Sequence, residues 1–151
     1  MRRADVQPCA KTEMKPVSPW FLPRASEGSR HTWGAVILGL MSRPIVSGGE
    51  VPVNLSSTWT EEAGSQIICH VELYPILLIK HALSKRLEGA RVKWFIDNEA
   101  AKDSLVAGFS ASVVSRKLVL QFYREQFSKP SANWFARVPS YSNIADGPSR
   151  G

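Results

Sequence analysis

Three acidic residues, far apart along the 151-residue chain, occupy positions at which a carboxylate can do chemistry. Glu72 falls on the apolar stripe of a predicted helix, Asp97 ends a hydrophobic predicted strand, and Asp146 lies in a polar segment after the last predicted strand. A carboxylate on an apolar helix face loses its hydration, so it needs an ionic partner, a proton or a bound cation. We therefore treat these three residues as the candidate functional side chains.

Each of the three also has a purely structural explanation. Glu72 can form a salt bridge to a lysine or arginine on a neighbouring element, Asp97 can cap the next helix, and Asp146 can belong to an ordinary capped turn. The position of Asp97 favours a functional role, because open α/β sheets place their ligand sites at the carboxyl ends of their strands. The residue types alone leave both kinds of explanation open.

Hydrophobic periodicity predicts the first elements that position these carboxylates. Residues 32–39 are β-branched and aromatic, and residues 44–51 follow within the reach of a hairpin, which indicates two adjacent antiparallel strands. Between residues 66 and 87, apolar side chains recur every three or four positions and predict a helix that ends at Gly89. An interior proline is unfavourable by about 3 kcal/mol, so Pro75 predicts that this helix starts late or kinks.

The second half of the chain alternates between strands and helices. Residues 91–97 predict a short buried strand, residues 98–108 a helix that follows it directly, residues 112–126 an amphipathic helix, and residues 132–138 a last strand. The predicted order is ββαβααβ with a tail. The fold class is therefore α/β, with a mixed sheet flanked by helices.

The first 28 residues differ from the rest. They contain four prolines among scattered charges and show no apolar periodicity. We therefore predict a disordered, proline-rich leader at residues 1–28, followed by a single domain at residues 29–151.

Composition narrows the class of partner. Lys plus Arg total 19 against 13 Asp plus Glu, a formal net charge of +6 that favours a polyanionic partner such as nucleic acid. No apolar run approaches the roughly 20 residues that a membrane span needs, and the sequence shows no secretory signal. Cys9 and Cys69 form neither a CxxC pair nor a disulfide framework. We therefore expect an intracellular protein, in the cytoplasm or the nucleus, with no membrane partner.

Four short motifs carry a resemblance to a known family. They are Val71-Glu-Leu-Tyr74, Trp94-Phe-Ile-Asp-Asn-Glu-Ala-Ala101, Trp134-Phe-Ala-Arg-Val-Pro-Ser140 and Asn143-Ile-Ala-Asp-Gly-Pro-Ser-Arg150. In this order they resemble the ribonuclease H domain of retrotransposon-type reverse transcriptases, over roughly residues 26–151. The resemblance implies an RNase H-like fold, which matches the order of strands and helices predicted above.

The resemblance also implies an activity, the hydrolysis of the RNA strand of RNA–DNA hybrids. Two divalent ions, Mg²⁺ or Mn²⁺, would do this chemistry, and hard oxygen ligands hold such ions best. Glu72, Asp97 and Asp146 are then both the catalytic and the metal-binding residues. A polymerase domain upstream in the parent element is also implied. The residues expected to contact the nucleic acid are Asn98, Arg116, Lys117, Trp134, Arg137 and Asn143.

One segment departs from the family pattern. The first strand of the family carries a catalytic aspartate, whereas residues 21–28 contain none, and Pro23 or Arg24 stands in its place. An arginine would repel the cations, and a proline has no N–H to donate within a central strand. We therefore expect the first strand to be missing or degenerate and the domain to be truncated.

Three functions fit this combination of residues. The first is metal-dependent hydrolysis of RNA in hybrids, the second is an inactive nucleic-acid-binding relic of a reverse transcriptase, and the third is a 3′–5′ exonuclease of the same superfamily. A small α/β interaction domain that binds no nucleic acid is an alternative from another class. It would show no salt-dependent affinity for duplexes.

Overall fold

The computed structural model describes residues 16–27, 30–63, 67–139 and 142, the first of these ranges by its backbone alone. The elements are β1 (Pro16–Glu27), β2 (Arg30–Leu38), β3 (Ile45–Glu50), α1 (Val53–Ala63), α2 (Ile68–Ala82), α3 (Ser84–Leu87), β4 (Arg91–Ile96), α4 (Glu99–Ala107), α5 (Val113–Ser128) and β5 (Ala132–Arg137). None of these helices is both long enough and apolar enough to cross a membrane.

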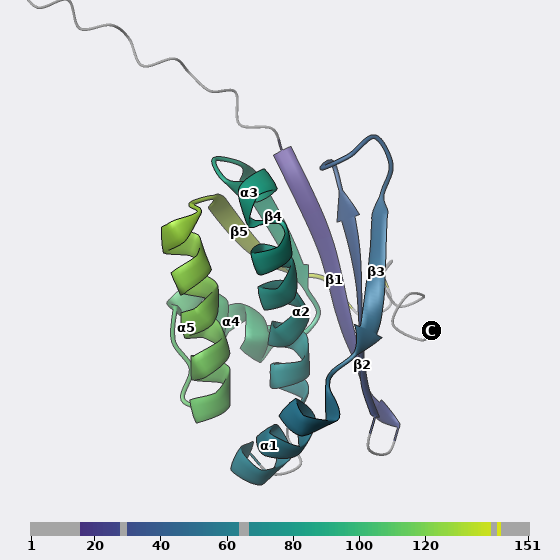
Figure 1. Cartoon of the computed structure of the whole chain (residues 1–151), viewed down its shortest axis with the longest axis vertical. Coiled ribbons are helices and arrows are strands. Elements are labelled where there is room, and N and C mark those ends of the chain that lie inside the picture. The colour runs from purple at the N-terminus through teal and green to yellow at the C-terminus, as the bar shows by residue number, and fades with distance from the viewer. Residues whose placement is uncertain (1–15, 28–29, 64–66, 140–141, 143–151) are drawn as a thin grey trace, which may run out of the picture.

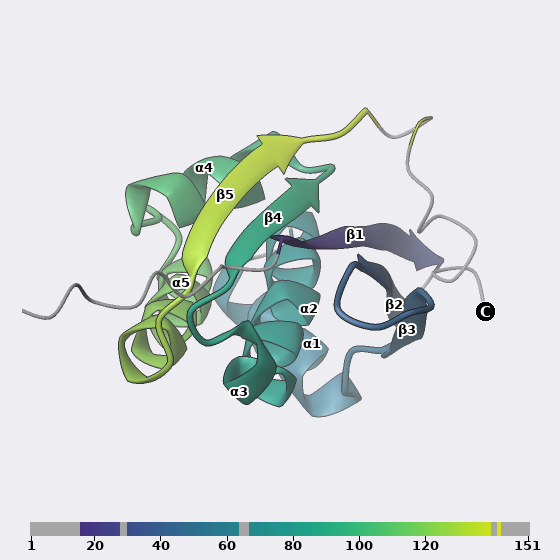
Figure 2. The same ribbon diagram turned by 90° about the horizontal axis from the view of Figure 1, so that it is seen from above.

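The five strands form one mixed sheet in the order β3-β2-β1-β4-β5. β2 is antiparallel to both of its neighbours, whereas β1, β4 and β5 run parallel to one another. The carboxyl ends of these three parallel strands therefore point the same way (Figure 2). Open α/β sheets place their ligand sites at this end. The predicted class, a mixed sheet flanked by helices, is confirmed.

The predicted leader is wrong over its second half, because residues 16–27 form the central strand of the sheet. β1 pairs with β2 on one side and with β4 on the other. Its prolines lower the local preference for a strand, but pairing on both sides overrides a local preference. The first strand is therefore present, and the domain includes Pro16 onward instead of beginning at residue 29. Residues 1–15 lie outside the described part of the chain.

The structure also contains a helix that the sequence did not predict. α1 lies between β3 and α2 and is rich in serine and threonine, and the Thr60 hydroxyl donates back to the Ser56 carbonyl at 2.9 Å. Such side chains compete for backbone hydrogen bonds and weaken the helical signal. Burial stabilises α1, because Trp59 joins a cluster of buried side chains that includes Val71 and Val114.

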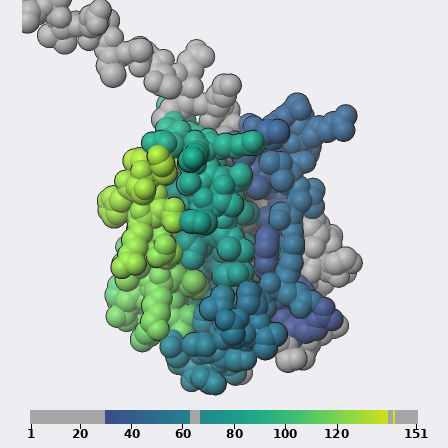
Figure 3. Space-filling model, in the orientation of Figure 1, coloured from purple at the N-terminus to yellow at the C-terminus, as the bar shows by residue number. Residues whose placement is uncertain are grey.

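Helices α2 and α5 pack side by side on one face of the sheet, and α4 lies beside β5 (Figures 1 and 2). Figure 3 shows this helical side of the molecule, with α1 at its lower end. Trp94 and Ile96 of β4 are fully buried in the main core, and the Trp94 ring meets Phe122 of α5 edge-on, with centroids 5.8 Å apart. These contacts fix β4 up to the residue that precedes Asp97.

The helix predicted at residues 66–87 is confirmed with one interruption, at Leu83, which separates α2 from α3. Gly89 follows with a φ of +71°, a left-handed backbone that favours glycine. Pro75 lies in the interior of α2, which begins at Ile68, so the predicted late start is wrong. Buried apolar side chains on both sides of the proline hold α2 in the core and offset its unfavourable effect.

Candidate metal and nucleic-acid site

Helix α2 places Glu72 inside the protein. The residue is 3% exposed, and its Oε2 atom is buried with no hydrogen-bond partner among the side chains that the structure describes. The ion pairs formed among the residues whose side chains the structure describes do not include Glu72, so a salt bridge to one of those residues is ruled out; the side chains of β1 lie outside this test. A buried carboxylate in this state bears a desolvation penalty that a ligand can relieve.

Strand β4 brings Asp97 to the carboxyl end of the parallel strands. Asp97 directly follows Ile96, the last residue of β4, which is held between β1 and β5. The next residue, Asn98, is the N-cap of α4, and its side-chain Oδ1 accepts the backbone N–H of Ala101 at 2.9 Å. The capping explanation proposed for Asp97 is therefore wrong, because Asn98 does the capping.

Glu72 and Asp97 interact electrostatically. Burial raises the pKa of the Glu72 carboxyl well above its usual range, and the negative charge of Asp97 raises it further. α2 and the end of β4 thus bring two of the three predicted carboxylates into one site. Asp146, the third, lies outside the described residues.

This pair of carboxylates suits one hard divalent cation. Mg²⁺ is commonly held by one or two carboxylates, with water completing its coordination. A cation would give the buried Oε2 of Glu72 the partner that it lacks and would offset the repulsion from Asp97. Across the described ranges, no three His, Cys, Asp or Glu side chains come together. A two-ion centre therefore needs oxygen ligands beyond these two residues.

Strand β1 runs directly beside β4 but has no aspartate. Trp20 pairs with Phe95, so two residues further along both strands Leu22 comes level with Asp97. Leucine offers no ligand for a metal ion. The central strand is therefore present in the fold without contributing a carboxylate next to Asp97.

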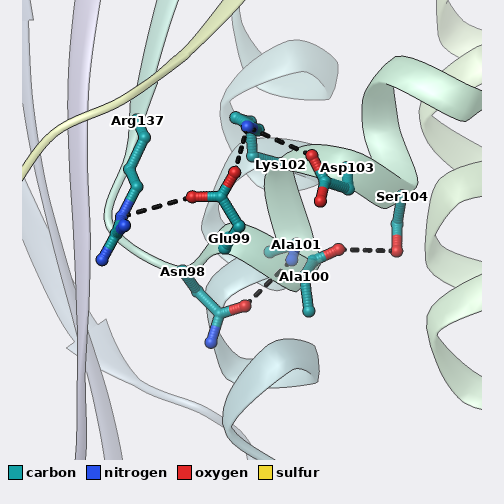
Figure 4. Close-up of polar contacts among 8 residues, drawn as sticks. All are labelled: Asn98, Glu99, Ala100, Ala101, Lys102, Asp103, Ser104 and Arg137. Atoms are coloured by element: carbon teal, nitrogen blue, oxygen red, sulfur yellow. Dashed lines mark hydrogen bonds and ion pairs between the residues drawn. The ribbon is translucent and has the colours of Figure 1, made fainter.

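Two of the residues predicted to bind nucleic acid lie beside Asp97. Asn98 follows it in the chain, and Arg137 of β5 pairs in register with Ile96 of β4. Arg137 Nε forms an ion pair with Glu99 Oε2 at 3.4 Å (Figure 4). This end of the sheet thus carries the carboxylate pair together with a cation of the type that binds phosphate.

Arg116 and Lys117, also predicted to bind nucleic acid, have local partners on the helical side. Arg116 donates to the carbonyls of Ser110 and Ala111 at 3.0 and 3.1 Å, and Lys117 forms an ion pair with Glu62 of α1 at 3.3 Å. These contacts belong to the connection between α4 and α5 and to α1. None of the described contacts joins the two residues to the carboxylate pair.

Trp134 lies on β5, at the edge of the sheet, and is 68% exposed. It is therefore not a core residue, although a tryptophan in a strand is often buried. Trp134 is in register with Lys93 of β4, and an aromatic ring beside a cation suits stacking on a base or a sugar. Asn143, the remaining predicted contact, lies outside the described residues.

The sequence did not predict a role for two charged residues of α4. Glu99 binds Arg137 through Oε2 and Lys102 through Oε1, and Lys102 Nζ also lies 3.1 Å from Asp103 Oδ1. The spacing of three residues between Glu99 and Lys102 is a sequence signal for the first pairing. No sequence signal points to Arg137, because this contact requires the ends of β4 and β5 to be neighbours.

No protein-family model and no curated protein matches the sequence. Solved structures match the fold. RNase H1 from the halophilic archaeon Halobacterium salinarum gives a TM-score of 0.65 at 14% identity, over 89% of this chain and 95% of that chain. An N-terminal RNase H domain from Mycobacterium tuberculosis gives 0.57 at 13% identity, over 90% and 91%. LC11-RNase H1, isolated from compost and solved in complex with an RNA/DNA hybrid, gives 0.59 at 13%, over 89% and 93%. At these identities the likeness establishes the architecture, and the chain has an RNase H-like fold.

Proposed function

We propose that this chain binds RNA–DNA hybrids and hydrolyses their RNA strand with Mg²⁺ or Mn²⁺ held by Glu72 and Asp97. The observation that carries the proposal is the buried, unpartnered Oε2 of Glu72 beside Asp97. The fold supports it, because the chain shares its architecture with RNase H1 structures, one of them in complex with a hybrid.

The energetic cost of burying an ionised Glu72 supports a ligand-binding role. An uncompensated charge in a protein interior costs on the order of 3 to 5 kcal/mol. Glu72 has no ion-pair partner among the residues whose side chains the structure describes, so a salt bridge to one of those residues does not explain its burial. A buried carboxyl whose pKa is raised well above its usual range, as that of Glu72 is, is typical of functional sites.

The residues around the pair have distinct parts in the proposed reaction. Glu72 and Asp97 hold a metal ion, and we assign Asp146 to the same site as a further oxygen ligand. A bound Mg²⁺ supplies an activated water and stabilises the charge on the leaving oxygen. Asn98 and Arg137 orient the sugar–phosphate backbone of the hybrid, since phosphate contacts fix the register of a bound nucleic acid.

A cleavage assay tests the proposal. The full chain is incubated with a labelled RNA–DNA hybrid and Mg²⁺ or Mn²⁺, and the wild type is expected to cut the RNA strand. Asp97→Asn and Glu72→Gln are each expected to slow cleavage by about 100-fold or more, because each removes several kcal/mol of metal-derived stabilisation. Glu61→Gln, which removes an exposed carboxylate on α1, is the matched control and is expected to leave the rate unchanged. Cleavage by Asp97→Asn at the wild-type rate contradicts the proposal.

Hybrid binding without hydrolysis is a second candidate function. Leu22 favours it, because this β1 residue comes level with Asp97 when the register of Trp20 with Phe95 is continued, and leucine cannot act as a ligand. The inactive chain would bind the labelled hybrid in a salt-dependent manner and leave it intact with either metal. Degradation of single-stranded DNA from its 3′ end would instead support the exonuclease alternative.

We also propose that the chain derives from the reverse transcriptase of a retroelement, in which a polymerase domain precedes the RNase H domain. The motifs around Glu72, Asp97 and Asp146 support this origin. Translation of the genomic DNA upstream of the Met1 codon in all frames is expected to show polymerase motifs, and an unrelated coding sequence there would contradict the origin.

A further inference from the structure

We propose that Glu99 is a specificity-determining residue. It keeps Arg137 in an ion pair when a polyanion binds loosely, and a phosphate of a correctly bound RNA–DNA hybrid displaces Glu99 from Arg137. The inference rests on the proposed function and adds to it a residue that selects among nucleic acids. It is carried by the ion pairs at the start of α4 and by their position beside Asp97.

A single carboxylate binds cations from two elements here. Glu99 is the first residue of α4, two positions after Asp97. Its Oε2 lies 3.4 Å from Nε of Arg137 on β5, while its Oε1 binds Lys102 one turn further along α4. Figure 4 shows Glu99 between these two cations. The carboxylate therefore offsets the charge of Arg137, at the carboxyl end of β5.

The backbone holds Arg137 beside the carboxylate pair. Arg137 is level with Ile96, and the next backbone N–H, that of Val138, donates to the Ile96 carbonyl at 3.1 Å. Arg137 is thus fixed one residue away from the level of Asp97. A guanidinium is the side-chain cation best suited to phosphate, because its planar donors match two phosphate oxygens.

The pair of Glu99 and Arg137 can be broken at little cost. The two side chains are 49% and 59% exposed, and an exposed ion pair is weak and screened by salt. A hybrid seated at this end of the sheet presents its phosphate at high effective concentration and can replace the carboxylate. A loosely bound duplex does not hold a phosphate at high effective concentration beside Arg137, and the negative charge of Glu99 repels it. The carboxylate therefore lowers non-specific binding more than hybrid binding.

Binding assays on charge-matched variants test the inference. Fluorescence anisotropy in EDTA, which prevents cleavage, gives the affinity of the full chain for a labelled RNA–DNA hybrid and for a DNA duplex of the same sequence between 50 and 200 mM salt. Glu99→Gln frees Arg137, whereas Asp103→Asn changes the net charge equally and leaves the contact between Glu99 and Arg137 in place. Only Glu99→Gln is expected to strengthen duplex binding through Arg137.

The expected result is a change in salt dependence for the duplex. One additional phosphate contact steepens the slope of log K against log salt by about 0.9, so the advantage of Glu99→Gln over Asp103→Asn grows about threefold between 200 and 50 mM salt. For the hybrid, the slope of log K against log salt is expected to be the same in Glu99→Gln as in the wild type. Because only duplex binding becomes stronger, the preference of the variant for hybrid over duplex is expected to fall. In the double variant Glu99→Gln with Arg137→Gln, the gain for the duplex is expected to disappear.

Two outcomes overturn the inference, and they differ in what they say about the proposed function. If Glu99→Gln and Asp103→Asn alter duplex binding equally, the effect is one of net charge, and only the inference fails. If neither the wild type nor any variant binds the hybrid, the proposed function fails as well. Thermal melting checks that each variant is folded, and Glu99→Asp, whose shorter side chain keeps the charge but withdraws from Arg137, replaces Glu99→Gln if that variant does not fold.

Discussion

Burial and a neighbouring charge set the chemistry of Glu72. Its buried Oε2 has no hydrogen-bond partner among the described side chains, and Asp97 adds a second negative charge, so the protein without metal favours the protonated form of Glu72. A divalent cation reverses this preference, because it stabilises the ionised carboxylate. Glu72 therefore couples metal binding, protonation and stability, and two predictions follow from that coupling at the scale of single residues.

Metal is expected to stabilise the folded chain. At a free Mg²⁺ or Mn²⁺ concentration of about 100 times Kd, binding to the native state contributes about 2.7 kcal/mol. Thermal melts with and without metal measure the resulting rise in Tm. Glu72→Gln is expected to lose most of this rise and the control Glu61→Gln to keep it. Equal shifts in all three proteins would mean that the metal binds elsewhere.

In the absence of metal, the stability of the Glu72→Gln variant relative to the wild type is expected to increase as the pH rises. The folded pKa of Glu72 is raised above the unfolded value of about 4.3, so the wild type is favoured relative to the variant at low pH and loses stability as the pH rises toward the folded pKa. Urea unfolding of both proteins in EDTA at pH 5 and pH 8 measures the difference, which should favour the variant more at pH 8. A difference independent of pH would be inconsistent with a perturbed Glu72.

At the scale of elements, β1 determines how many ligands the site can hold. Leu22 lies level with Asp97, so Leu22→Asp is expected to add a carboxylate beside the metal and to raise metal affinity by about tenfold, since affinity follows the number of charged ligands. Titration with Mn²⁺ measures the affinity. Leu22→Asn is the control of matched shape. Equal affinities in the two variants would show that residue 22 does not reach the site.

Helix α2 is joined to the connection between α5 and β5 by a buried lysine. Lys80 is fully buried and donates to the Lys129 carbonyl at 3.0 Å and to the Ser131 hydroxyl at 2.8 Å. Burial lowers the pKa of Lys80 to about 8. The unfolded chain therefore holds the proton of Lys80 more tightly than the folded chain does. This difference lowers the stability of the fold below about pH 8, and the penalty disappears as the pH rises to the unfolded pKa of about 10.4.

The wild type is therefore expected to gain stability relative to Lys80→Met between pH 7 and pH 9.5. Urea unfolding at the two pH values measures the free energies of unfolding. Lys85→Met, which removes an exposed lysine of α3, is expected to show no such dependence. If the gap between the wild type and Lys80→Met is the same at both pH values, Lys80 does not titrate in this range.

The elements differ in how well the sequence predicts them. α2, β4 and α5 were predictable because their apolar residues recur with the period of a helix or form a continuous buried run. β1 was not, because its prolines are unfavourable in isolation and its pairing with β2 and β4 depends on residues far along the chain. α1 was missed because its serines and threonines give a weak helical signal, and its burial depends on α2 and α5.

At the scale of the whole molecule, the RNase H-like fold brings together side chains that are distant in the sequence. Glu72 and Asp97 could be singled out from their positions, one on an apolar helix face and the other at the end of a buried strand, but only the resemblance to RNase H domains implied that they form one site. The contact between Glu99 and Arg137 could not be predicted, because it arises only where β4 and β5 lie side by side. The end of the sheet thus combines a predictable carboxylate pair with an unpredicted cation.

A titration with Mn²⁺ followed by NMR tests the central claim most directly. Paramagnetic Mn²⁺ broadens the resonances of nearby nuclei, so the backbone amides of Glu72 and Asp97 are expected to disappear first. Asp97→Asn is expected to abolish this selective broadening, whereas Asp103→Asn, a carboxylate change on the exposed side of α4, should leave it in place. Selective broadening around other acidic residues, with the signals of Glu72 and Asp97 unaffected, would contradict the assignment of this pair as the metal site.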